Sequence, residues 1–178
     1  MRYSIAASAI LTIAVIMALL ARQRPAPAPN QAETADPSLA SVFHTSDPRV
    51  AGQLLEGFHE AEAGGRWTKS RFAVALGVPH LAPGAQPELV VKLFIPESEM
   101  AKLKSMTLTA TVGGAALPPE TFTSGGLHTY LRKLPLAAVR GDRVRADFAL
   151  DKWQPAGTVD DRELAIVVAA IGLTEGGF

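Results

Sequence analysis

Two tryptophans and a tyrosine are the residues of this sequence whose chemistry points most directly to a ligand. Trp67 lies between Arg66 and Thr68, and this polar surround predicts an indole that is partly exposed. An exposed aromatic ring offers a flat apolar face with a polar edge, and a sugar ring can stack on such a face. A place in the core or at its edge is the simpler interpretation for Trp67 and Trp153, and we include both with Tyr130 as candidates for a ligand platform.

A pair of carboxylates is the second candidate. Glu60 and Glu62 are two residues apart, so they share one face if this stretch is a strand. Paired carboxylates can bind a cation or act as acid and base, which leaves a carboxylate-based hydrolase as a minor alternative. Their surroundings match no metal-binding motif, and a solvated strand edge is the simpler interpretation. We include both glutamates among the ligand-binding candidates.

The composition excludes several classes of function. Lys and Arg total 17, as do Asp and Glu, whereas a nucleic-acid-binding domain normally shows a basic excess. The chain has no cysteine, which removes thiolate nucleophiles and cysteine-ligated zinc. No nucleophile elbow, phosphate-binding loop or dinucleotide fingerprint is present. The sequence therefore predicts no catalytic residues, no metal, no cofactor and no nucleic-acid partner.

The elements that must position the candidate residues read mostly as β-strands. In the clearest of them, 106–112, apolar residues alternate with polar ones, and Gly113 and Gly114 follow as a tight hairpin turn. Pro118 and Pro119 are interpreted as a gap between strands. Further strands are expected over 71–76, 88–95, 128–134, 143–150 and 164–173. About seven or eight short strands predict an all-β fold, an antiparallel β-sandwich or jelly roll.

Two short helices are expected beside these strands. Ser46 and Asp47 can cap a helix that has Pro48 in its first turn, and Gly57 is a plausible C-cap. Residues 96–104 suggest a second helical turn. The first helix would open a domain that covers residues 46–178.

The N-terminal part predicts a membrane segment and a linker. Residues 3–21 carry no charge, and a spanning helix needs about 20 apolar residues. Candidate cleavage sites are poorly placed, so we expect residues 1–21 to be an uncleaved signal-anchor, with secretion after signal cleavage as the alternative. The domain is then expected outside the cytoplasm, on a bacterial inner membrane. Residues 22–45 are rich in Ala and Pro and predict a semi-rigid linker.

Three stretches together resemble a bacterial β-sandwich module with a galactose-binding-like, jelly-roll fold. These are 57–62 with 66–68, then 93–97, then 161–166 ending in 171–173. Similar modules accompany glycosyltransferases and methyltransferases of surface-polysaccharide synthesis. The resemblance implies glycan-related binding at the cell envelope and brings no catalytic residues with it.

Two functions from different classes follow. The first is a non-catalytic, membrane-tethered module that binds carbohydrate or supports assembly of envelope polysaccharide. It predicts that Trp67, Trp153 or Tyr130 are exposed together on one face or rim. The second is a protein-interaction or scaffolding module of an envelope complex, which predicts an apolar patch or an open sheet edge with buried aromatic residues.

Overall fold

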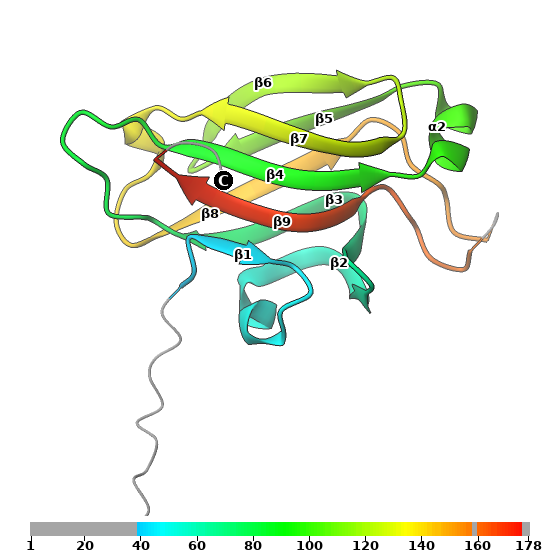
Figure 1. Ribbon diagram of the computed structural model, residues 1–178, viewed down its shortest axis with the longest axis horizontal. Coiled ribbons are helices and arrows are strands. Elements are labelled where there is room, and N and C mark those ends of the chain that lie inside the picture. Colours follow the sequence, from blue (N-terminus) through cyan, green and yellow to red (C-terminus); the bar gives the residue numbers. More distant parts are fainter. Residues whose placement is uncertain (1–38, 158–159, 176–178) are drawn as a thin grey trace, which may run out of the picture. The chain divides into compact units, whose positions relative to one another are not determined.

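Among the residues that the structure describes, nine strands form one antiparallel sheet, which confirms the all-β prediction (Figure 1). The computed structural model describes residues 39–157 and 160–175. Strand order in the sheet is β6-β5-β8-β3-β9-β4-β7, with β1 paired to β9 and β2 paired to β3. In chain order the elements are β1 (Val42–His44), η1 (Pro48–Gln53), β2 (Leu54–Glu62), β3 (Gly65–Gly77), β4 (Glu88–Ile95), α2 (Glu97–Leu103), β5 (Met106–Val112), β6 (Ala115–Phe122), β7 (Gly126–Lys133), η2 (Leu136–Ala138), β8 (Arg143–Leu150) and β9 (Val167–Thr174).

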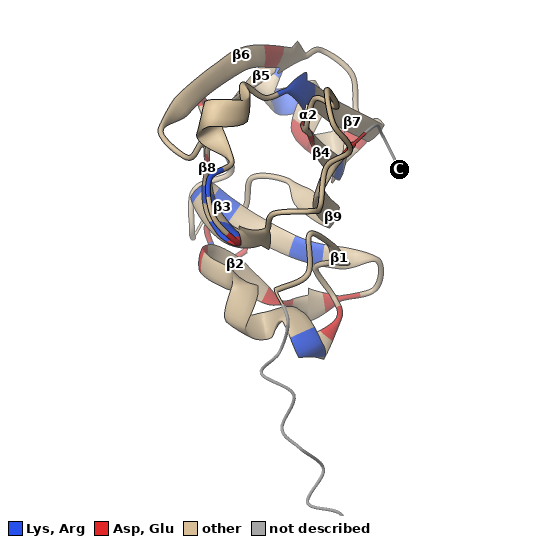
Figure 2. Cartoon of the chain, turned by 90° about the vertical axis from the view of Figure 1, so that its left-hand side faces the viewer, with Lys and Arg blue, Asp and Glu red and all other residues tan. Residues whose placement is uncertain are grey.

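The long strand β3 belongs to both halves of this sheet. Its first residues, Arg66 and Trp67, pair with β9, whereas Arg71–Gly77 pair with β8. The sheet therefore turns along β3, and Figure 2 shows its strands arranged around a nearly closed, barrel-like ring. The hydrogen bonds thus run through one curled sheet, whereas the sequence pattern predicts a sandwich or jelly roll with fewer strands.

Strand β6 was not expected, because Pro118 and Pro119 lie inside it. Proline lacks the N–H that a ladder needs and is tolerated on an edge strand, and β6 is an edge of this sheet. Strand β7 is the other edge of the sheet, and its side chains donate hydrogen bonds to backbone carbonyls of β6. The Tyr130 hydroxyl donates to the Pro118 carbonyl at 2.9 Å, and Arg132 donates to the Pro118 and Pro119 carbonyls at 2.8 and 3.0 Å. Proline carbonyls therefore help to bring the two edges together.

The core lies inside the curled sheet and follows the predicted period of two. In β4 the inward residues Leu89, Val91, Leu93 and Ile95 are fully buried, and β5 alternates in the same way. Phe72 of β3 stacks on Phe148 of β8, with ring centroids 4.7 Å apart and planes 10° from parallel. Gly113 and Gly114 close the β5–β6 hairpin with φ of 54° and 84°, as the sequence predicts.

The start of the domain differs from the prediction at two points. The described part of the expected linker contains β1, whose Phe43 is buried in the core, so the ordered domain begins before residue 46. The first helix is a 3₁₀ turn in which the Asp47 carboxylate caps Arg49 N–H at 2.9 Å, as expected. It ends at Gln53, and Gly57 is not its C-cap.

Gly57 instead lies inside β2, at an irregular stretch of its pairing with β3. Its φ of 77° is left-handed, and a Cβ here would lie 2.7 Å from the Phe72 Cα and would also meet the Arg71 carbonyl oxygen. Glycine is thus required for both its conformation and the close approach of the two strands. The second predicted helix is confirmed as α2.

The expected membrane segment, residues 3–21, and most of the linker lie outside the described residues. Within the described ranges, no helix has both the length and the hydropathy that crossing a membrane would require.

Candidate ligand-binding surface

Four side chains on four neighbouring strands form an apolar row on the outer face of the sheet. Trp67 of β3 is directly opposite Val167 of β9, Val167 is opposite Phe94 of β4, and Phe94 is opposite Leu127 of β7. Directly opposed residues of antiparallel strands project from the same face. We call Trp67, Val167, Phe94 and Leu127 the aromatic row.

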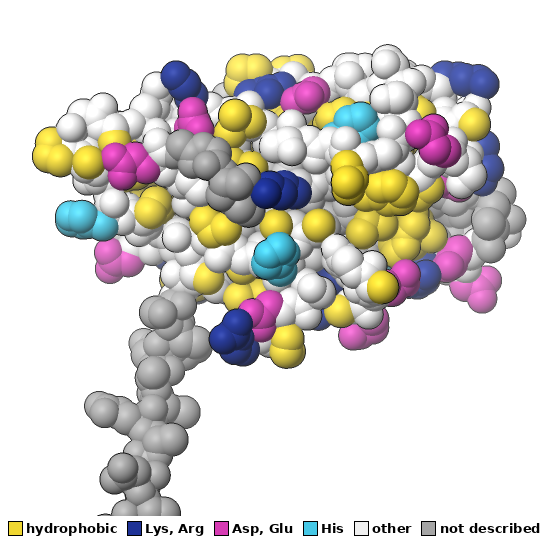
Figure 3. Space-filling model, in the orientation of Figure 1, with side chains coloured by type: hydrophobic (Ala, Val, Ile, Leu, Met, Phe, Trp, Pro, Cys, Tyr) yellow, Lys and Arg dark blue, Asp and Glu magenta, His cyan; other side chains and the backbone are white. Residues whose placement is uncertain are grey.

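The aromatic row is open to solvent. Leu127 is 84% exposed and Phe94 37%, while Trp67 and Val167 are partly buried. Figure 3 shows hydrophobic side chains gathered over the α2 end of β4, where β7 and β9 begin. Exposed apolar side chains that are contiguous across four strands are uncommon on a protein surface, which makes this row the candidate binding surface.

A polar row runs beside the aromatic row on the same face. His44 of β1 is opposite Ala170 of β9, which is opposite Lys92 of β4, and Lys92 is opposite Thr129 of β7. Lys92 and Phe94 are two residues apart in one strand, which separates the rows by about 7 Å. His44 and Thr129 are exposed and present hydrogen-bonding groups to solvent. The face therefore offers an apolar strip bordered by polar groups.

Trp67 is held in the row by its neighbours on β3. The backbone N–H of Thr68 donates to the Ile166 carbonyl at 2.9 Å, and the Thr68 carbonyl accepts from Ala165 N–H at 2.8 Å. Thr68 is fully buried, so alternation turns the adjacent Trp67 outward. The partly exposed position expected for Trp67 agrees with the structure.

Tyr130 is not exposed, and the expectation that it joins the tryptophans on the surface is wrong. Its ring is fully buried beneath the Arg132 guanidinium, which lies 4.4 Å from the ring centroid. This burial raises the pKa of the Tyr130 hydroxyl. The alternation of β7 places Tyr130 inward and Leu127, Thr129 and Leu131 outward, so period two identifies Tyr130 as a core residue.

Trp153 is 38% exposed, but it lies off the strands that carry the aromatic row. It follows β8, next to Gln154, which forms an isolated bridge with Leu164. Ring contacts among the described residues join Phe58, Phe72, Phe148, Phe122 and His128, and neither indole is among them. The two tryptophans therefore do not form one stacked platform.

Glu60 and Glu62 lie on β2, the strand beside Trp67, and each faces an arginine. Glu62 pairs with Arg162 at 2.9 Å, and the Glu60 carboxylate lies 4.0 Å from the Arg66 guanidinium. Among the described residues, no hydrogen bond joins either glutamate to His128 or Asp161, and no group of three or more His, Asp or Glu side chains could hold a metal ion. The structure thus places them on a charged border of the aromatic row.

Arg162 is the centre of this border. Its guanidinium and backbone N–H donate hydrogen bonds to Asp160 and hold the pKa of that carboxyl at about 2. The carboxylates of Asp160 and Glu62 in turn raise the pKa of Arg162. Ser70 N–H donates to Glu163 at 2.6 Å and lowers the pKa of that carboxyl. These groups keep their charges over the physiological pH range.

Sequence reasoning missed Val167, Phe94 and Leu127, as well as His44 and Thr129. In each single strand, one apolar residue on the outward face does not by itself indicate a binding surface. The pairing register alone reveals that three such residues align with Trp67.

No family model matches the sequence, and a search of curated proteins finds no relative. Solved structures with a similar strand arrangement include a GH115 4-O-methyl-α-glucuronidase with specificity for decorated arabinogalactans, at 12% identity and a TM-score of 0.43, over 85% of this chain and 19% of that one. Latent PorU from Porphyromonas gingivalis matches at 9% identity and a TM-score of 0.42, over 76% and 12% of the two chains. The carbohydrate-binding module CBM36, solved with calcium and xylotriose, matches at 8% identity and a TM-score of 0.40, over 75% and 98%.

This chain therefore spans under a fifth of the first two of these structures. All three TM-scores are below 0.5 and carry no argument about function.

Proposed function

We propose that this domain is a non-catalytic carbohydrate-binding module, whose ligand lies along the aromatic row. The observation that carries the proposal is the aromatic row bordered by the polar row. A pyranose ring has the same division, with an apolar face of C–H groups and a rim of hydroxyls. Stacking on Trp67 and Phe94 would leave these hydroxyls to the polar groups beside them.

The spacing of the row suits an extended glycan. Adjacent strands are about 4.8 Å apart, so Trp67 and Phe94, two strands apart, are separated by roughly 10 Å. Two aromatic rings at this separation would serve two positions along one polysaccharide chain. Support for envelope polysaccharide assembly is the cellular role that such binding would serve.

The alternative is a protein-interaction module, and Leu127 favours it. Its aliphatic side chain is 84% exposed and extends the apolar patch by an area that a protein partner would bury. The two functions use different members of the row. Sugar stacking needs the indole of Trp67, whereas a protein interface needs apolar area and would tolerate leucine there.

Affinity electrophoresis of the full chain tests the proposal, in gels that contain arabinoxylan, β-glucan or dextran and a detergent without a sugar headgroup. We expect retardation by at least one of these neutral polysaccharides and at least a roughly tenfold weaker affinity for Trp67→Leu, because a buried Trp contact contributes about 1.4 kcal/mol or more. Trp67→Phe should keep most of the binding.

Trp153→Phe is the matched control, since it removes an exposed indole outside the row and leaves Trp67 as the only tryptophan. Its fluorescence should shift on addition of the retarding glycan. Equal mobility in all three gels, or unchanged affinity in Trp67→Leu, would overturn the proposal. Capture of a protein that Leu127→Ser abolishes and Trp67→Leu spares would favour the alternative.

We also propose that residues 3–21 tether the domain to the bacterial inner membrane, on the extracytoplasmic side. The support is the length of the uncharged run. Full-length protein should stay with membranes after extraction at high pH, with the mass of the uncleaved chain. Release into the supernatant, or loss of the leader, would instead support secretion after cleavage.

A further inference from the structure

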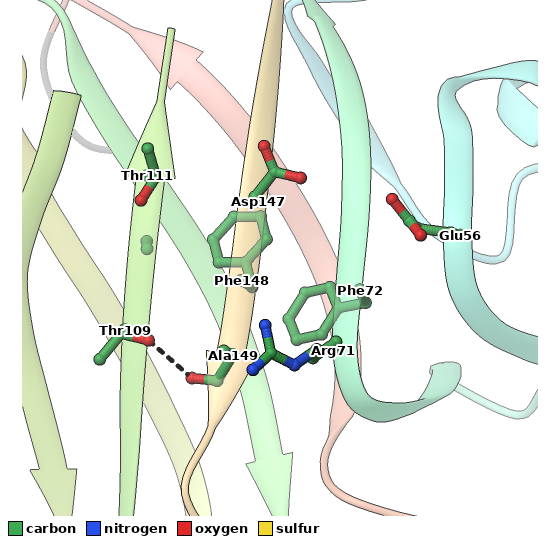
Figure 4. A pocket seen from close by; sticks show the side chains of 9 residues that line it. Glu56, Arg71, Phe72, Thr109, Thr111, Asp147, Phe148 and Ala149 are labelled. Atoms are coloured by element: carbon green, nitrogen blue, oxygen red, sulfur yellow. Dashed lines mark hydrogen bonds between the residues drawn. The ribbon is translucent and has the colours of Figure 1, made fainter. Parts of the chain in front are cut away.

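A second recognition surface lies on the other half of the sheet, as a groove of about 530 Å³. Residues of β3, β8 and β5 that are paired across the strands line it. Arg71 is opposite Ala149, which is opposite Thr109, and in the neighbouring pair Asp147 is opposite Thr111. Glu56 of β2 stands at one side (Figure 4). The volume lies within the range of small-molecule sites.

Two stacked aromatic rings form the floor of the groove, and an arginine pairs with the carboxylates at its side. Phe72 and Phe148, stacked in the core, lie beneath it. Arg145 of β8 forms ion pairs with Glu56 of β2 and with Asp147 of its own strand, the latter at 2.7 Å. One guanidinium therefore ties β2 to β8 and engages both carboxylates of the groove.

Arg71 is different, because its guanidinium has no hydrogen bond or ion pair with any of the described residues. It points along the groove towards Thr109 (Figure 4). Thr109 donates to the Ala149 carbonyl at 3.1 Å, which fixes its hydroxyl beside this free cation. Arg71 thus offers a planar, bidentate donor set of the kind that binds carboxylate groups.

The charges around Arg71 favour a singly charged ligand. Arg145 pairs with both carboxylates, Glu56 and Asp147, and together with Arg71 it brings the formal charge of these four groups to zero. A dianion would add excess negative charge beside Asp147 and Glu56. A carboxylate adds only one charge. The hydroxyls of Thr109 and Thr111 suit a ligand that itself carries hydroxyls, which favours an acidic sugar over an acidic peptide.

We propose that this groove is a second, independent site that binds the carboxylate of an acidic sugar on Arg71, with sugar hydroxyls on Thr109 and Thr111. The site goes beyond the proposed binding at the aromatic row and shares none of its residues. It would let one domain hold a uronic-acid unit apart from a neutral glycan chain.

Amide chemical shifts of the labelled full chain, followed during titration, test the site. D-glucuronate should shift residues of β5, β8 and the second half of β3, while glucose, inorganic phosphate and N-acetylglutamate should shift them at least tenfold more weakly. Arg71→Gln should weaken glucuronate binding by roughly tenfold or more, since a hydrogen-bonded charge pair is lost. The control Arg143→Gln removes an exposed arginine of β8 outside the groove and should leave binding unchanged.

Trp67→Leu should also leave glucuronate binding unchanged, so that failure of the neutral-glycan proposal would not be mistaken for failure here. No shifts with glucuronate, equal binding of phosphate, or unchanged affinity in Arg71→Gln would overturn the site. Stronger binding of N-acetylglutamate than of glucuronate would overturn the acidic-sugar assignment.

Discussion

The aromatic row and the groove occupy two parts of one outer surface and differ in almost every physical respect. The row is apolar, open and built from Trp67, Val167, Phe94 and Leu127, whereas the groove is charged, concave and centred on Arg71. Both depend on β3. Its first half carries Trp67 beside β9 and its second half carries Arg71 beside β8.

Trp67 and Arg71 are four residues apart, roughly 13 Å along the strand. Both follow the alternation that turns them outward. They serve different surfaces because β3 exchanges one pairing partner for another between them. A change of pairing along one strand is thus enough to separate two chemical environments.

The largest expected loss of stability comes from a substitution in the core beneath both surfaces. Phe72→Ala should lower the free energy of unfolding by about 3–5 kcal/mol, because it leaves a cavity beneath the groove and removes the stack on Phe148. Urea unfolding would measure this loss. The matched change Phe94→Ala, on the exposed row, should cost less than about 1 kcal/mol. Similar losses for both would mean that Phe94 is a core residue and that the row is not a free surface.

The next largest effect on stability is expected in β2, at the glycine that packs against β3 beneath the groove. Gly57→Ala should destabilise the domain by roughly 2–4 kcal/mol, because a methyl group at a φ of 77° would also meet the Phe72 backbone. Gly64→Ala has a φ of 90° but an open surround, so about 1 kcal/mol is expected. Thermal or urea unfolding of the pair would check the difference. Equal losses would contradict the close approach of β2 and β3.

A smaller effect concerns the charged border of the row. The pKa of Asp160 is lowered from 3.8 to about 2 by its hydrogen bonds from Arg162. A depressed carboxyl pKa stabilises the folded state above the unfolded pKa, and this contribution is lost as the pH falls through the folded pKa. The Asp160–Arg162 contact should therefore persist at pH 4 and weaken towards pH 2. A carboxyl ¹³C titration of Asp160 with a midpoint near 3.8 would rule out this pairing.

Most of the strands could be predicted from the sequence, because their inward faces are consistently apolar. Strands β5 and β8 alternate strictly between buried and more exposed residues, whereas β4 also buries Val90, and all three match their predicted bounds. Strand β6 could not be recognised, since Pro118 and Pro119 are acceptable only where no ladder partner is needed. The edge position that permits them is a property of the whole sheet.

The candidate surfaces were less predictable than the strands. Trp67 could be identified from its polar neighbours, but the row beside it depends on registers that bring residues 67, 94, 127 and 167 together. The groove was not foreseen at all. Arg71 reads as an ordinary polar start of a strand, and only the pairing of β3, β8 and β5 surrounds it with Thr109, Thr111 and Asp147.

The most direct test of this account is one titration series, in which the full chain, Trp67→Leu and Arg71→Gln are each titrated with the retarding neutral glycan and with D-glucuronate. Two separate surfaces predict that Trp67→Leu loses the neutral glycan and keeps glucuronate, while Arg71→Gln loses glucuronate and keeps the neutral glycan. Loss of both ligands in either variant, with folding intact, would contradict the claim that β3 supports two independent sites.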